Sequence, residues 1–224
     1  MCGRFAQVLS RKILELLYRL ENIAEMEPRY NIAPSQHALV LRTSPQGGKR
    51  ELSRLQWGLI PAWVREERSA NKPINARVET VELKPSFLEA FRQRRALIPA
   101  SGYYEWQKMG GKKQPYFIHS KDERPLSLAG IWEKWERGGQ TRETFAILTV
   151  AACGRMAELH NRMPLILPER AFDRWLAGDT GPAELQEMLR PFPEVELAAY
   201  PVSPLVNNPA NDSPACLQEL EVGS

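Results

Sequence analysis

Residues 127–150, SLAGIWEKWERGGQTRETFAILTV, decide the fold of this chain. Two runs in this stretch, 127–132 and 144–150, are rich in β-branched and aromatic residues, the types that strands favour. Between them lies Gly138-Gly139, a pair that marks turns. The stretch therefore predicts two strands joined as a hairpin.

The same strand-and-turn pattern continues on both sides of this hairpin. Further turn signals stand at Pro45-Gln46-Gly47-Gly48 and at Gly110-Gly111. Between these signals, short β-rich segments predict strands over residues 36–42, 51–59, 95–99, 115–119 and 195–200.

Helical signals are fewer than strand signals. From Ser10, a suitable N-cap, to Leu20, apolar residues recur at helical spacing. Proline suits the first turn of two further helices. Together these signals predict helices over residues 10–20, 85–93, 168–177 and 182–190.

The order of these elements is neither a strict βαβ alternation nor all-β. We therefore expect an α+β fold, a mainly antiparallel curved sheet or distorted barrel with peripheral helices. No linker, repeat or low-complexity block divides the chain, so we expect a single domain over residues 1–224, with a flexible tail over residues 208–224.

Composition excludes several classes of protein. The chain has 224 residues, a formal net charge of +3 and 43% hydrophobic residues, which suits an ordinary buried core. No segment approaches the roughly 18 apolar residues that a membrane span needs, and we expect a cytoplasmic protein. Three cysteines and three histidines are too scattered to predict a disulfide framework or a metal site.

The first four residues, Met1-Cys2-Gly3-Arg4, carry the strongest chemical signal. Removal of Met1 would place an α-amine and a thiol on one residue. With an aldehyde, such an aminothiol forms an imine and then a thiazolidine ring. With an amide, the thiolate attacks and the amine acts as base, as in N-terminal nucleophile hydrolases. The alternative is that Cys2 is incidental.

Five segments place polar or aromatic residues beside proline or glycine, as loops that present side chains do. They are Tyr30–Pro34, Trp57–Trp63, Asn75–Thr80, Gly102–Trp106 and His160–Pro164.

Three polar residues in these segments suit proton transfer and orientation. Glu105 stands between aromatic residues, which raise the pKa of a carboxyl group and suit a general acid or base. The imidazole of His160 suits proton shuttling. The amide of Asn75 suits orientation of a substrate oxygen. The structural alternatives are a surface ion pair for Glu105, a buried hydrogen-bonded ring for His160 and a turn cap for Asn75.

Arginines and tryptophans in the same segments suit a nucleic acid. Arg4, Arg77 and Arg162 offer guanidinium groups for phosphate or carboxylate, although scattered salt bridges would use the same residues. Trp63 and Trp106 offer rings on which bases stack, although core packing is the commoner role of tryptophan.

Taken together, these motifs closely resemble the SRAP family, the SOS-response-associated peptidases or abasic-site-shielding proteins. The resemblance runs from Met1 to about Asn207 and includes Gln114-Pro115-Tyr116. It implies a single α+β domain that binds single-stranded DNA, including junctions with duplex DNA, and crosslinks to the aldehyde of an abasic site. It implies no metal or organic cofactor, a monomer, and association with the nucleoid in a bacterium.

The resemblance also implies roles for individual residues. Cys2 would be the crosslinking residue after removal of Met1. The chain itself or an aminopeptidase would remove Met1. Slow lyase turnover, or reversal of the crosslink, would use the same groups. Asn75, Glu105 and His160 match the other active-site positions. Phosphates would be held by Arg4, Arg77 and Arg162, and the DNA path would be lined by Pro34 and Trp106. Trp63 would stand where duplex DNA is wedged open, and Thr149 would belong to the wall of the site.

Two other functions fit parts of the sequence. One is an N-terminal nucleophile amidohydrolase of the glutamine amidotransferase type, in which Cys2 forms a thioester. The other is a non-catalytic module for single-stranded DNA, in which Cys2 is inert.

Overall fold

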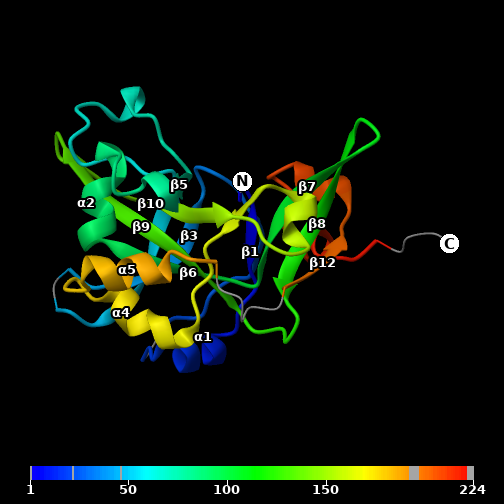
Figure 1. The fold of residues 1–224 in the computed structure, drawn as a ribbon, viewed down its shortest axis with the longest axis horizontal. Helices are drawn as coiled ribbons and strands as arrows, with labels where there is room; N and C mark the ends of the chain where they lie inside the picture. The colour runs from blue at the N-terminus through cyan, green and yellow to red at the C-terminus, as the bar shows by residue number, and fades with distance from the viewer. Residues whose placement is uncertain (1, 22, 46, 192–196, 221–224) are drawn as a thin grey trace.

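The structure is a computed structural model that describes residues 2–21, 23–45, 47–191 and 197–220. In these residues the strands form two sheets (Figure 1). The five-stranded sheet has the order β12-β8-β7-β1-β2, and its strands are β1 (Phe5–Gln7), β2 (Arg29–Ile32), β7 (Gly102–Met109), β8 (Lys112–Ser120) and β12 (Leu197–Pro201). The seven-stranded sheet contains β3 (His37–Thr43), β4 (Arg50–Trp57), β5 (Asn75–Arg77), β6 (Arg95–Ala100), β9 (Leu126–Arg137), β10 (Gln140–Ala151) and β11 (Arg162–Pro164).

The seven-stranded sheet closes on itself. Its order runs β11-β10-β4-β3-β6-β9, and β9 also pairs with β10, so β10, β4, β3, β6 and β9 form a ring. Most pairs in this ring are antiparallel, while β10 and β4 pair in parallel. The expected distorted barrel is therefore confirmed, and the first hairpin that the sequence predicts, β9–β10, closes it.

Close packing inside the barrel depends on Gly130. A Cβ atom at this position would lie 2.3 Å from Cδ1 of Ile98 and 3.0 Å from the carbonyl oxygen of Ala146. A side chain here would force Ile98 to move and would crowd the β10 main chain, so glycine lets β9 lie against both neighbours without either adjustment.

The helices lie outside the sheets, as expected. They are α1 (Arg11–Tyr18), α2 (Pro85–Gln93), α3 (Met156–Leu159), α4 (Phe172–Leu176) and α5 (Pro182–Met188), with 3₁₀ turns η1 (Glu67–Ser69), η2 (Val78–Thr80), η3 (Glu169–Ala171), η4 (Pro204–Asn207) and η5 (Pro214–Cys216). Figure 1 shows α2, α4 and α5 gathered beside the barrel, away from the β7–β8–β12 sheet. Ser10 caps α1 as predicted, and Arg19 ends it early by taking a left-handed conformation.

Two other predicted elements differ in extent. The single helix expected over residues 168–177 is divided into η3 and α4. The strand expected over residues 195–200 corresponds to β12, and residues 195–196, like Gln46 in the predicted turn, lie outside the described residues.

Four of the five segments expected to be loops contain strands instead: β2, β5, β7 and β11. Glu105 accordingly lies within β7 and not in a loop after a strand. The reason is tertiary pairing: β5 and β11, three residues each, gain their hydrogen bonds from β10. Local sequence carries little signal for such short strands.

The expected flexible tail is wrong for residues 208–220. The Asp212 carboxylate accepts hydrogen bonds from the main-chain N–H groups of Tyr30 and Asn31, and Cys216 is fully buried. The segment therefore packs against β2, because its polar groups replace water at that strand. Residues 221–224 lie outside the described residues.

Candidate active site at the N-terminal cysteine

Cys2 lies where the two sheets meet. On one side, the main-chain N–H of Tyr104 donates to the Arg4 carbonyl at 2.9 Å, which aligns residues 2–4 with β7. On the other side, Nδ2 of Asn75, on β5 of the barrel, donates to the Cys2 carbonyl at 2.8 Å. The side chain of Cys2 is fully buried. Strands from both sheets therefore fix this cysteine.

Burial dominates the electrostatics of the cysteine and of Glu105. It raises the pKa of the Cys2 thiol, and the negative charge of Glu105 raises that pKa further. It also raises the pKa of the Glu105 carboxyl, against positive charges that include His160 and lower it. The thiol is therefore held protonated, and the carboxyl is shifted toward the range of a general acid or base.

The ring of His160 is held by the main chain of Arg162. The N–H of Arg162 donates to Nδ1 of His160 at 2.9 Å, and Nδ1 also lies 3.2 Å from the Arg162 carbonyl oxygen, so the main chain of Arg162 fixes the Nδ1 side of the ring. His160 follows α3, and its own N–H donates to the Met156 carbonyl at 3.1 Å. Helix end and hydrogen bond together orient the imidazole for proton transfer through Nε2.

The four predicted catalytic residues are thus brought together. Asn75 contacts the main chain of Cys2, Glu105 and Cys2 interact electrostatically, and so do Glu105 and His160. Oδ1 of Asn75 is buried and has no hydrogen-bond partner among the described residues. This amide oxygen can accept a hydrogen bond from a hydroxyl group of a ligand.

Arg162 lies beside this cluster in an ion pair. Its Nη1 and Nη2 donate to the two carboxylate oxygens of Glu79 at 2.6 and 2.9 Å, and Nη2 also donates to the carbonyl of Thr149. Thr149 is fully buried on β10. The Glu79 pKa is lowered, chiefly by its hydrogen bonds to Arg162.

Arg4 is placed differently from the sequence-based expectation of a phosphate contact. It is only 9% exposed, and its Nη1 donates to Oδ1 of Asn31 at 2.7 Å and to the Val206 carbonyl at 2.6 Å. Its guanidinium lies 5.8 Å from the centre of the Trp106 ring, whose Nε1 donates to Oδ1 of Asn207 at 2.7 Å. Arg4 therefore lies against the ring of Trp106, and we call Trp106 with its partner Asn207 the Trp106 wall.

The remaining predicted DNA contacts lie on the surface. Arg77 and Pro34 are exposed, and Trp63 is 61% exposed.

Sequence reasoning missed three residues that organise this region: Asn31, Glu79 and Asn207. The first two stand inside segments that the sequence singles out, and an acid two residues from Arg77 was the available signal for Glu79. Nothing in the local sequence around Asn207 indicates its contact with Trp106.

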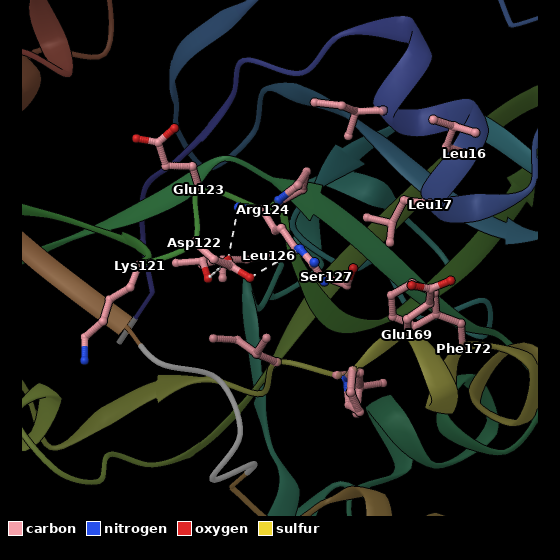
Figure 2. A pocket seen from close by; sticks show the side chains of 16 residues that line it. Leu16, Leu17, Lys121, Asp122, Glu123, Arg124, Leu126, Ser127, Glu169 and Phe172 are labelled. Carbon is pink, nitrogen blue, oxygen red and sulfur yellow. Dashed lines mark hydrogen bonds and ion pairs between the residues drawn. The ribbon is translucent and has the colours of Figure 1, made fainter.

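A cavity of about 890 Å³ lies elsewhere, between α1 and the turn that joins β8 to β9. Figure 2 shows Leu16 and Leu17 of α1 facing Lys121, Asp122 and neighbouring residues across it. Its lining includes none of the predicted site residues.

The described residues offer neither a metal-binding cluster nor a helix that could span a membrane. No set of three or more His, Cys, Asp and Glu side chains is arranged to hold a metal ion there. None of the helices in that part of the chain is long and apolar enough to cross a membrane.

The fold and the site together define the class of protein: a closed β-sheet beside a second sheet, with a candidate active site around a cysteine at position 2. The family model described as "SOS response associated peptidase (SRAP)" matches residues 1–209. The chain therefore belongs to the SRAP family.

Individual relatives agree with this assignment. The abasic site processing protein YoqW of Bacillus subtilis is 37% identical over 97% of this chain and 99% of its own length. The abasic site processing protein YedK of Escherichia coli is 34% identical over 98% and 100%. A solved structure from Bacteroides thetaiotaomicron superposes with a TM-score of 0.83 at 28% identity, over 98% of this chain and all of that one.

Proposed function

We propose that this protein senses and shields abasic sites in single-stranded DNA by crosslinking the abasic aldehyde to Cys2 after removal of Met1. The observation that carries the proposal is the convergence of Cys2, Asn75, Glu105 and His160 at one place between the two sheets. Family membership supports it, and so do the names of the relatives, which are abasic site processing proteins.

The chemistry follows from the groups present. The free α-amine of Cys2 adds to the aldehyde carbon, and the carbinolamine loses water to give an imine. The thiol then adds to the imine carbon and closes a thiazolidine. The proton of the Cys2 thiol ends on the ring nitrogen. The overall reaction is therefore aldehyde plus aminothiol giving thiazolidine plus water.

Each neighbour has a step in this sequence. Glu105, with its raised pKa, opens the sugar hemiacetal and donates the proton that the departing water requires. It then accepts the thiol proton, which a thiol of raised pKa does not release alone. Nε2 of His160 relays protons, and the open Oδ1 of Asn75 orients a sugar hydroxyl.

The DNA path follows from exposure. Arg77 contacts a phosphate, Pro34 and Trp106 line the single strand, and Trp63 stands where a duplex is wedged open at a junction. Arg162 and Thr149 form the wall nearest the reaction. Arg4 supports Trp106 from behind. The protein acts as a monomer.

Two further activities belong to the same groups. Removal of Met1 is the peptidase step that exposes the amine, carried out by this chain or by an aminopeptidase. Slow lyase turnover or reversal of the crosslink proceeds from the imine, through Glu105 and His160.

A denaturing gel tests the proposal. The protein is mixed with matched abasic and intact single-stranded oligonucleotides, and mass spectrometry establishes the mature N-terminus. The proposal expects a covalent band with the abasic strand alone, lost in Cys2→Ala and kept in the control Cys153→Ala, which removes an exposed cysteine. Equal non-covalent binding to both strands indicates a simple binding module. Glutamine hydrolysis without a band indicates the amidohydrolase.

A further inference from the structure

Glu79 makes a contact that the proposed function does not use. Its carboxylate meets the guanidinium of Arg162 side by side, with N–O distances of 2.6 and 2.9 Å. This paired geometry is the one that a guanidinium also offers to a phosphate group. The carboxylate therefore occupies donors that a DNA phosphate would need.

The remaining surface of Arg162 is closed. Nη2 of Arg162 also donates to the carbonyl of Thr149, and Oγ1 of Thr149 lies 3.3 Å from the same nitrogen. The Arg162 side chain is 12% exposed, whereas the Glu79 side chain is 51% exposed. Glu79 thus covers the side of the guanidinium that faces solvent, and a phosphate has to approach from that side.

The Glu79 carboxylate also interacts electrostatically with a second arginine, Arg77. Arg77 lies two residues before Glu79 and is exposed. The two arginines that the proposed DNA path places nearest the reaction therefore share one carboxylate.

We infer that Glu79 holds the place of a backbone phosphate at Arg162 in the DNA-free protein and is displaced when a single strand binds. The inference rests on the proposed function, because it specifies how that site takes DNA. Displacement costs binding free energy for every strand. A strand that carries an aldehyde is retained by the covalent bond at Cys2, whereas an intact strand leaves. Glu79 therefore lowers the occupancy of the site by intact strands without changing the ratio of the two non-covalent affinities, because the cost is the same for both strands.

The test compares Glu79→Gln with the native protein on an intact fluorescent oligonucleotide, between about 50 and 300 mM salt. Glutamine keeps the size of the side chain and removes its charge. We expect about three- to fivefold tighter binding, the range of an exposed ion pair. The slope of log K against log salt becomes steeper by about 0.7, because no carboxylate is left to take up a cation.

Two controls isolate the contact with Arg162. Glu82→Gln removes the same charge three residues further along, where the carboxylate accepts from Gln186, and leaves the salt slope unchanged. In an Arg162→Gln background, Glu79→Gln has a smaller effect on affinity, because its contact with Arg162 is gone while its interaction with Arg77 remains. An equal effect in both backgrounds, or weaker binding by Glu79→Gln alone, overturns the inference.

The outcome is separable from that of the proposed function. A native protein that forms no covalent band with an abasic strand refutes the function. A native protein that forms the band, while Glu79→Gln leaves affinity and salt slope unchanged, refutes the role of Glu79 alone.

Discussion

Replacement of Asn31 by alanine is expected to loosen the C-terminal segment and with it the Trp106 wall. Asn31 is fully buried. Its Nδ2 lies within hydrogen-bond distance of the carbonyls of Val206, Asn208 and Asn211 at 3.2, 3.1 and 2.7 Å, and its Oδ1 accepts from Arg4 at 2.7 Å.

The magnitude follows from these contacts. An amide nitrogen has two hydrogens, so at most two of the three carbonyls are satisfied at once. Two neutral hydrogen bonds at about 1 kcal/mol each and one to a charged donor at about 2 kcal/mol sum to about 4 kcal/mol. For a chain of this size, that loss lowers Tm by about 8 to 16 °C.

Urea unfolding, followed by tryptophan fluorescence and circular dichroism, measures the loss. Asn208→Ala is the matched control, because Asn208 is exposed and, among the described residues, its side chain accepts a hydrogen bond from the N–H of Ala210 alone, so about 1 kcal/mol or less is expected. Asn31→Asp keeps the acceptor for Arg4 but turns a carboxylate toward the three carbonyls, and it is expected to destabilise as well. A loss below about 1.5 kcal/mol for Asn31→Ala would show that these bonds are replaced by water and refute the reasoning.

Four further outcomes are expected. Arg95→Leu costs about 3 kcal/mol or more in urea unfolding, because this buried guanidinium donates to four main-chain carbonyls that leucine leaves unsatisfied; a loss under about 1 kcal/mol contradicts this. Glu105→Gln slows crosslinking by about 10²- to 10⁴-fold in a quenched time course. Because folding raises the Glu105 pKa, the native state binds more protons than the unfolded chain between the ordinary and the raised pKa, so stability falls as pH rises through that window. Melting curves for Glu105→Gln should lack this fall, and a parallel dependence in both proteins sinks the argument. In the native protein, an alkylating reagent at pH 8 labels exposed Cys153 before buried Cys2, whose pKa is raised, as peptide mass spectrometry reports; equal rates would mean that Cys2 is open to solvent.

Sequence reasoning predicted most of the long elements, but it missed the short strands and also β7, whose residues 102–106 it placed in a loop. The strands 127–132 and 144–150 were found because β9 and β10 carry continuous apolar runs that local pattern detects. By contrast, β5 and β11 are three residues long, and their pairing with β10 arises only after the barrel has formed. The local sequence therefore predicts loops at both places.

The candidate site was predicted in part for a different reason. Cys2, Asn75, Glu105 and His160 were identified by their residue types and by resemblance to a family, and the structure places them together. The assignment of Arg4 to a phosphate did not anticipate its burial, because its partners Asn31 and Val206 come from segments distant in sequence. No local pattern reports which partner an arginine takes.

The spread of the cluster along the chain has a consequence for synthesis. Cys2 leaves the ribosome first, but its partner His160 follows 158 positions later, and the carbonyl of Val206 that holds Arg4 comes later still. At about 5 to 20 residues per second, the aminothiol waits about 8 to 32 s for His160 to be synthesised. A nascent or truncated chain that ends before His160 therefore displays the nucleophiles without the groups that direct them, and crosslinking competence arrives only near the end of translation.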